Sequence, residues 1–189
     1  MDDTRKNIIT SAQDLFLRYG IKSVSVDEIC HEIGISKKTF YQFFEGKNEL
    51  IEELLKHKCK TVRENALAYM NGKTAKECVE MLMNMHNKVS TKRQQPKIVR
   101  DLQKYYPTLY KEHIHNIYMD TKDILSRHLE QGKAEKIYRE DLDVEMCATM
   151  FSLIQLEIMR NGYELKDVNQ KRFIGFILES FFKAIKNEE

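Results

Sequence analysis

The segment SVDEICHEIGISKKTFYQFFEGKNEL, residues 25–50, constrains the fold of this chain more than any other. Its first part has apolar side chains at the spacing of one helical face: Val26, Ile29, Cys30 and Ile33. That spacing predicts a short helix with one buried side. Ser25 and Glu28 are placed to form a capping box, in which each side chain satisfies the other residue's backbone N–H. Gly34 is expected to end the helix, because glycine enters the left-handed backbone region at little cost.

A second short helix is predicted directly after this turn, over residues 37–44, with Ser36 as its cap. Phe40 and Phe44 share its inward face, and polar side chains stand at its N-terminal end: Lys37, Lys38 and Thr39. Two helices joined by a short glycine-containing turn, the second with polar residues at its start, describe a helix-turn-helix.

From Ile8 to Leu55 the chain resembles the DNA-binding domain of the tetracycline-repressor (TetR) family of bacterial regulators. The matched positions include Ala12, Leu15, Phe16, Gly20, Ser25, Val26, Ile29, Ile33, Gly34, Ile35, Ser36, Thr39, Phe40, Tyr41, Phe43, Phe44, Lys47 and Leu50. Beyond this first quarter, the chain is similar to the family only in its helical pattern and its length. The resemblance implies an all-α fold of about nine helices. In it, a three-helix DNA-binding domain, residues 1–46, precedes a larger helical domain for dimerisation and effector binding, residues 47–189.

Composition agrees with a helical protein. Two prolines, seven glycines and 32% charged residues favour helices over a β-sandwich. No run approaches the ~20 apolar residues that span a bilayer, and the first residues lack the features of a signal peptide. We therefore expect a cytoplasmic protein with no membrane partner. The cysteines are widely spaced on apolar helical faces, which predicts reduced core thiols: Cys30, Cys59, Cys78 and Cys147.

The charge of the N-terminal region is unusual for a nucleic-acid-binding domain. The whole chain has a net charge of +2, but residues 1–56 contain eight basic and ten acidic side chains. The positions of the lysines matter more than their number. Lys37, Lys38 and Lys47 stand at the N-terminal ends of predicted helices, where unpaired N–H groups already favour phosphate. We expect DNA binding that depends on salt, with weak non-specific affinity.

The outward residues of the second helix are candidates for reading bases. A lysine can donate to guanine O6 and N7 in the major groove, and a threonine methyl can contact the thymine methyl. Lys37, Lys38 and Thr39 are therefore expected to contact base edges, although lysines on an exposed helix can also be merely solvated. Lys38 departs from the TetR pattern, which often has a small residue at this position.

The resemblance implies further DNA contacts. Tyr41, Lys47 and Ser25 match positions that contact the phosphate backbone, and Ser36 belongs to the same surface. Phe43 stands where the family often has histidine or tyrosine, so it can offer only an apolar contact. On this reading, Lys47→Ala would weaken binding to all sequences and give a shallower salt dependence.

The last two predicted helices, residues 143–161 and 168–186, are apolar over so wide an arc that each needs two burial partners. They could form a thick core within one subunit. The resemblance favours packing against a second copy of the chain instead. The residues expected at such a homodimer interface are Phe151, Phe173, Ile177 and Phe181.

A small-molecule site in the C-terminal domain is also implied by the resemblance. Gln155 interrupts an apolar run, and a buried amide needs a partner that a ligand, a neighbouring helix or the dimer interface could provide. The candidate lining suggests a largely apolar effector: Met81, Met85, His86, Tyr118, Met150, Phe151 and Gln155. Alternate methionines of the segment 81–86 point to different sides of a helix, so a metal site is not expected there.

No catalytic motif is present, and neither enzyme activity nor a cofactor is expected. The sequence therefore predicts a homodimeric transcriptional repressor that binds an inverted repeat in double-stranded DNA and is released by a small lipophilic effector. The alternative is a TetR-like interaction protein that acts through partner contacts without binding an operator.

Overall fold

The computed structural model describes residues 3–80, 97–161 and 170–187, and within these ranges the regular structure is helical. The labelled helices are α1 (Asp3–Tyr19), α2 (Val26–Ile33), α3 (Lys37–Tyr41), α4 (Lys47–Met70), α6 (Lys97–Tyr105), α7 (Pro107–Ala134), α8 (Val144–Asn161) and α9 (Gln170–Ile185). Residues 75–80 are also helical. In this part of the chain, extended pairing is limited to an isolated antiparallel bridge between Tyr138 and Lys186. The all-α fold expected from the sequence is confirmed.

The helices form two compact units, which we call the head and the body. The head contains residues 1–60 and 95–115, and the body contains residues 61–94 and 116–189. These units do not follow a single cut at residue 46, because the first part of α4 and all of α6 belong to the head.

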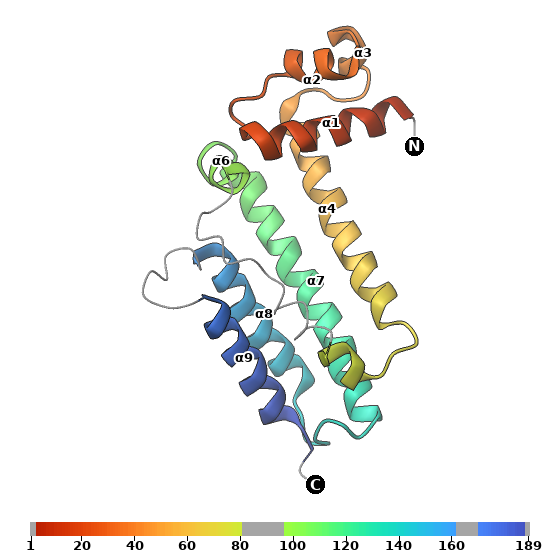
Figure 1. The fold of residues 1–189 in the computed structure, drawn as a ribbon, viewed down its shortest axis with the longest axis vertical. Helices are drawn as coiled ribbons and strands as arrows, with labels where there is room; N and C mark the ends of the chain where they lie inside the picture. The colour runs from red at the N-terminus through yellow and green to blue at the C-terminus, as the bar shows by residue number, and fades with distance from the viewer. Residues whose placement is uncertain (1–2, 81–96, 162–169, 188–189) are drawn as a thin grey trace. The chain divides into compact units, whose positions relative to one another are not determined.

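The head has one apolar core, and α2 and α3 lie together on one side of α1 (Figure 1). Phe40 and Phe44, both from the helix-turn-helix region, are fully buried with ring centroids 5.6 Å apart. Leu102 of α6 is buried in the same cluster, so α6 completes this core. The cluster also contains Ile8, Ala12, Phe16, Ile21, Val24, Ile29 and Leu50.

The body has a second core, around which α8 and α9 run side by side next to the later part of α7 (Figure 1). Leu129 of α7 and Ala148 of α8 are fully buried there. The Arg63 guanidinium binds two carboxylates of α7, Asp120 at 3.1 Å and Asp123 at 2.6 Å. The remaining members of the core include Ala75, Leu125, Tyr138, Leu142, Leu178, Phe181, Phe182 and Ile185.

Most expected local features are present. Pro107 is the first residue of α7, where its missing N–H costs no hydrogen bond. The Thr74 and Glu77 side chains form a second capping box, with Glu77 Oε2 accepting from the Thr74 backbone N–H at 2.7 Å. The helix predicted over residues 37–44 is shorter than expected and ends at Tyr41. No helix in the described ranges is both long enough and apolar enough to cross a membrane.

Candidate nucleic-acid interface

The cap of α2 has the predicted geometry. The Glu28 N–H donates to Ser25 Oγ at 3.2 Å, and the Ser25 N–H donates to Glu28 Oε2 at 2.6 Å. The Ser25 hydroxyl also donates to the same carboxylate oxygen, at 2.8 Å. These bonds hold the pKa of Glu28 below its usual value. A phosphate at Ser25 would therefore lie beside a charged carboxylate, which disfavours the expected phosphate contact.

The turn between α2 and α3 is also built as predicted. Gly34 has φ 69° and ψ 33°, in the left-handed region, and the Ile35 N–H donates to the Cys30 carbonyl at 3.0 Å. Ser36 then caps α3, because its Oγ accepts from the Thr39 N–H at 3.0 Å. The Ser36 and Thr39 hydroxyls lie 2.9 Å apart and bond to each other. Both side chains thus hold the start of α3 in place.

The outer side of α3 presents Lys37, Lys38 and Tyr41, all of which are exposed. Lys37 Nζ lies 2.7 Å from an Asp27 carboxylate oxygen, and this hydrogen bond raises the pKa of Lys37. Lys38 makes no ion pair with the residues that the structure describes. Asp27 was not among the predicted site residues. Its contact depends on the angle between α2 and α3, which no linear motif in the sequence specifies.

Two other predicted contacts are less accessible. Thr39 is half-buried, and Phe43 is half-buried because it packs against the core of the head. The backbone N–H of Phe43 donates to the Phe40 carbonyl at 3.0 Å, within the turn that ends α3. Phe43 therefore supports α3 from the core and has only part of its ring available for DNA.

The placement of Lys47 differs from the one expected. Its Nζ donates to the backbone carbonyls of Ile21 and Val24 and lies 5.7 Å from the centroid of the Phe16 ring. Burial lowers the pKa of Lys47. The ammonium group thus points into the head, since these carbonyls lie within reach of the start of α4.

None of the candidate effector residues that the structure describes is fully buried. Met81, Met85 and His86 lie outside the described residues. Tyr118 and Phe151 are half-buried, and Met150 is exposed. Gln155 is exposed, so the expectation of a buried amide was wrong. Among residues 144–157 of α8, for which burial is described, Ala148 and Ser152 are the fully buried ones, and both precede Gln155.

The residues predicted for the dimer interface also differ in burial. Phe181 is only 7% exposed and packs in the core of the body, where its ring centroid lies 4.8 Å from that of Phe151. The expectation that Phe181 faces a second subunit was therefore wrong, whereas Phe173 and Ile177 are half-buried. Exposed apolar side chains on α8 and α9 were missed by the prediction: Met146, Leu153 and Phe176.

The cysteines are free thiols, as the sequence analysis expected. None of the four cysteines forms a disulfide, and burial raises the pKa of the Cys30, Cys78 and Cys147 thiols. No three His, Cys, Asp or Glu side chains gather into a metal site within the described ranges.

A capped helix-turn-helix with lysines at the exposed start of its second helix defines the helix-turn-helix class of DNA-binding proteins. The sequence pattern of one such family, described as bacterial regulatory proteins, tetR family, matches residues 8–54. This part of the chain is thus similar to the DNA-binding domain of regulatory proteins of the tetR family.

The chain is also similar to an individual regulator over part of its length. The HTH-type transcriptional regulator SrpR of Pseudomonas putida is 30% identical over 54 residues, which cover 29% of this chain and 25% of that protein. The alignment thus spans about a quarter of the relative's length.

Solved structures share the whole fold. A TetR-family regulator from Cytophaga hutchinsonii has a TM-score of 0.73 at 20% identity, covering 100% of this chain and 97% of that one. A second transcriptional regulator from Cytophaga hutchinsonii ATCC 33406 has a TM-score of 0.76 at 16% identity, with coverages of 98% and 100%. The fatty acid degradation regulator FadR from Bacillus halodurans has a TM-score of 0.68 at 18% identity, and the match covers 96% of each chain.

Proposed function

We propose that this chain is a homodimeric transcriptional repressor that binds an inverted-repeat operator through α3. The observation that carries the proposal is the pair of exposed lysines, Lys37 and Lys38, at the start of a capped helix in a tetR-family domain. Lysine side chains at this position can donate to guanine in the major groove. Occupancy of a promoter would then block transcription without a separate activation surface.

Selection of bound sequences from a random DNA pool, followed by gel-shift titration, tests this function. We expect an inverted repeat whose half-sites lie about 34–36 Å apart, the distance between successive major-groove faces. Lys38→Ala should relax the selected sequence and cost about 1–3 kcal/mol of binding. Lys76→Ala, which removes an exposed lysine of the body, is the matched control.

The alternative, an interaction protein without operator binding, has two features in its favour. Residues 1–56 carry more acidic than basic side chains, and the Lys37 ammonium forms an ion pair with Asp27. No enrichment of any sequence from the pool, at low salt and high protein concentration, would favour this alternative over the repressor.

The dimer of the proposal uses the exposed apolar face of α8 and α9. Met146, Met150 and Leu153 follow the i, i+4, i+7 spacing of one face of α8. Phe176 of α9 is 66% exposed, an unusual state for an aromatic ring on a helix that otherwise packs in a core. A second copy of this face would remove these side chains from water.

A small lipophilic effector completes the proposal. The Ser152 hydroxyl is buried in α8 and has no hydrogen-bond partner among the described residues, so a ligand could satisfy it. A structural neighbour regulates fatty acid degradation, which also favours an apolar effector. Such an effector must bind the DNA-free form more tightly, typically by about 1–3 kcal/mol. Release of operator DNA by a panel of fatty acids and other lipophiles, with Ser152→Ala compared with wild type, tests this part.

A further inference from the structure

The loop that connects α1 to α2, residues 20–24, is held from two sides by charged groups outside the loop. On one side, Asp101 of α6 accepts a hydrogen bond from the Lys22 backbone N–H, with 2.9 Å between Lys22 N and Asp101 Oδ2. On the other side, Lys47 at the start of α4 donates to the carbonyls of Ile21 and Val24. The next residue after this loop is the cap of α2.

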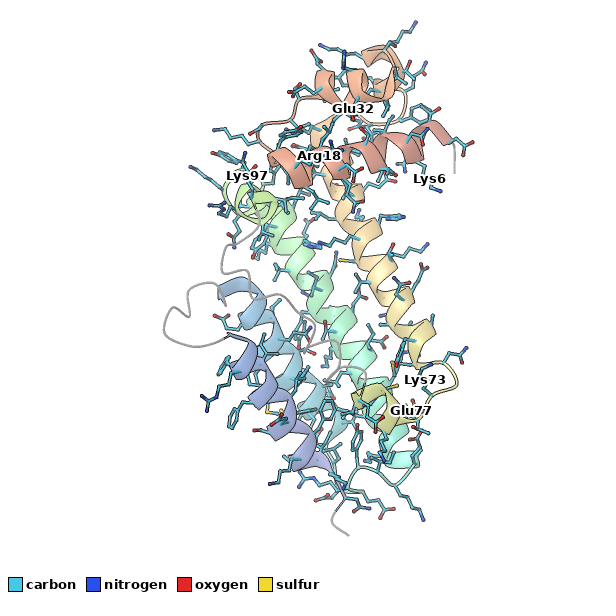
Figure 2. The ribbon with its side chains drawn as sticks, in the orientation of Figure 1. Lys6, Arg18, Glu32, Lys73, Glu77 and Lys97 are labelled. Carbon is cyan, nitrogen blue, oxygen red and sulfur yellow. The ribbon has the colours of Figure 1, made fainter. Side chains whose placement is uncertain are left out.

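The start of the loop is closely packed against side chains of α6. Gly20 has φ 85°, and a Cβ built there would lie 2.7 Å from Asp101 Oδ2 and 2.8 Å from Lys97 Cδ. Figure 2 shows Lys97 beside the end of α1 that carries Arg18, and α1 and α6 are in contact. Ile21 and Val24 are both buried in the core of the head. The loop therefore cannot shift without disturbing either α6 or the core.

The two charged groups depend on each other. Asp101 is only 8% exposed, and the ammonium of Lys47 is partly desolvated. Burial lowers the pKa of Lys47, whereas the negative charge of Asp101 raises it by favouring the protonated ammonium. Removal of either charge would take away one of the other group's nearby counter-charges, which also include Glu28 for Lys47 and Lys22 for Asp101. Both groups also pair with backbone atoms of the loop, whose own hydrogen bond between the Val24 N–H and the Ile21 carbonyl is long, at 3.4 Å.

We propose that Lys47 and Asp101 are positioning residues for DNA binding, which fix the α1–α2 loop and thereby orient α2 and α3 without contacting DNA. The inference rests on the proposed operator binding of the head. It assigns a function to Asp101, which lies on α6 outside the helix-turn-helix. It also gives Lys47 a role within the protein instead of the phosphate contact that the sequence suggested.

The salt dependence of DNA binding separates these two roles. A lost phosphate contact lowers the slope of log K against log salt concentration by about 0.9 per contact, whereas a lost positioning residue lowers affinity at an unchanged slope. Lys47→Met keeps the aliphatic stem, and Asp101→Leu keeps the approximate shape of the side chain. We expect both variants to bind the selected operator about tenfold more weakly or worse, with the wild-type slope. Lys38→Ala, at the exposed interface, should instead relax the selected sequence, which neither positioning variant should do.

A flatter slope for Lys47→Met, together with full affinity for Asp101→Leu, would overturn the proposal and restore the phosphate contact. Full affinity for both variants would overturn it as well.

Hydrogen exchange in the full-length protein provides a test that needs no DNA. Both variants should exchange the amides of Lys22 and Ser25 at least about tenfold faster than wild type, because the loop loses its fixed position. Amides of α8 in the body serve as the control for global unfolding and should be unchanged. Wild-type exchange rates in the loop of both variants would contradict the proposal. If the wild-type protein binds no DNA at any salt concentration, the proposed function fails, and exchange still decides whether the two residues hold the loop.

Discussion

At Gly132 the backbone of α7 is covered directly by the ring of Tyr138. A Cβ at this position would lie 2.1 Å from two ring carbons, closer than any non-bonded contact allows. The Gly132 carbonyl also accepts from the N–H groups of Ile137 and Tyr138, at 2.9 and 3.1 Å. The Tyr138 hydroxyl lies 2.6 Å from His128 Nε2, so the ring cannot move aside without breaking a buried hydrogen bond.

Gly132→Ala should therefore destabilise the body, although alanine is the better helix former. We expect a loss of about 1–3 kcal/mol in the free energy of unfolding, the usual cost of overpacking, measured by urea denaturation. Gly46→Ala is the control, because no atom lies within 4 Å of a Cβ built there. Equal stability of the two variants would show that the Tyr138 ring adapts freely.

Asp27 provides a second prediction for single residues, because it holds the ammonium of Lys37 in an exposed ion pair. Asp27→Asn should release Lys37 and remove a negative charge near the DNA backbone. The variant should then bind both operator and unrelated DNA more tightly, with a larger relative gain for unrelated DNA. Competition gel shifts with the two DNAs measure this ratio. A variant that binds operator more weakly would instead mean that Asp27 aims Lys37 at a base.

The residues of the interface were only partly predictable. Exposure of Lys37, Lys38 and Tyr41 followed from helical periodicity, which is a local property of the sequence. The inward turn of Lys47 was not predictable in the same way. It depends on carbonyls more than twenty positions earlier in the chain, whose distance from α4 is set by tertiary packing.

Among the elements, the helix caps are local devices that the sequence specifies well. Within the part of the chain that the structure describes, a capping box lies at Ser25 in the head and another at Thr74 in the body. Ser25→Ala and Thr74→Ala should each lower stability by about 0.5–2 kcal/mol, measured by urea denaturation. Only Ser25→Ala should also weaken operator binding in gel shifts, because its helix supports α3. Equal loss of binding in both variants would point to a general effect of instability.

The wide apolar arcs of α8 and α9 show where prediction from the sequence fails. Periodicity identified both helices, but it could not tell which apolar residues face the core of the body. Phe181 proved to be buried and Phe176 exposed, although both are phenylalanines on one apolar helix. That choice depends on how α9 is rotated against α7 and α8, and single-sequence patterns do not encode this rotation.

For the whole molecule, the exposed face of α8 and α9 gives a prediction about assembly. A double variant, Leu153→Lys with Phe176→Lys, should be a folded monomer in sedimentation analysis, because both side chains are exposed in one subunit. Phe181→Lys should unfold the body instead, since it places a charge in the core. A wild-type protein that is monomeric at micromolar concentration would contradict the proposed dimer.

One buried histidine, His128, and one half-buried histidine, His113, make the stability of the protein sensitive to acid. Burial lowers the pKa of His113 in the head and of His128 in the body to about 4. The pKa of a histidine in the unfolded chain is near 6.5. Between pH 6.5 and pH 4 the unfolded chain therefore binds protons that the folded chain does not, so the free energy of unfolding falls as the pH falls. The loss should reach up to roughly 3 kcal/mol per histidine.

Urea denaturation at several pH values measures this effect. His128→Gln should make the stability of the body less dependent on pH over this range, whereas His31→Gln, at an exposed position of α2, should leave the dependence unchanged. Identical pH profiles for wild type and His128→Gln would contradict the prediction.

The discontinuity of the head has a consequence for its synthesis on the ribosome. Residues 1–60 leave the ribosome first, yet Leu102 and Asp101, which complete the core and hold the α1–α2 loop, follow about forty residues later. A nascent chain that ends after α4 would therefore display the lysines of α3 on a domain that is not yet finished. Binding of DNA by the growing chain should be delayed until α6 has emerged, by which time translation has begun on the body.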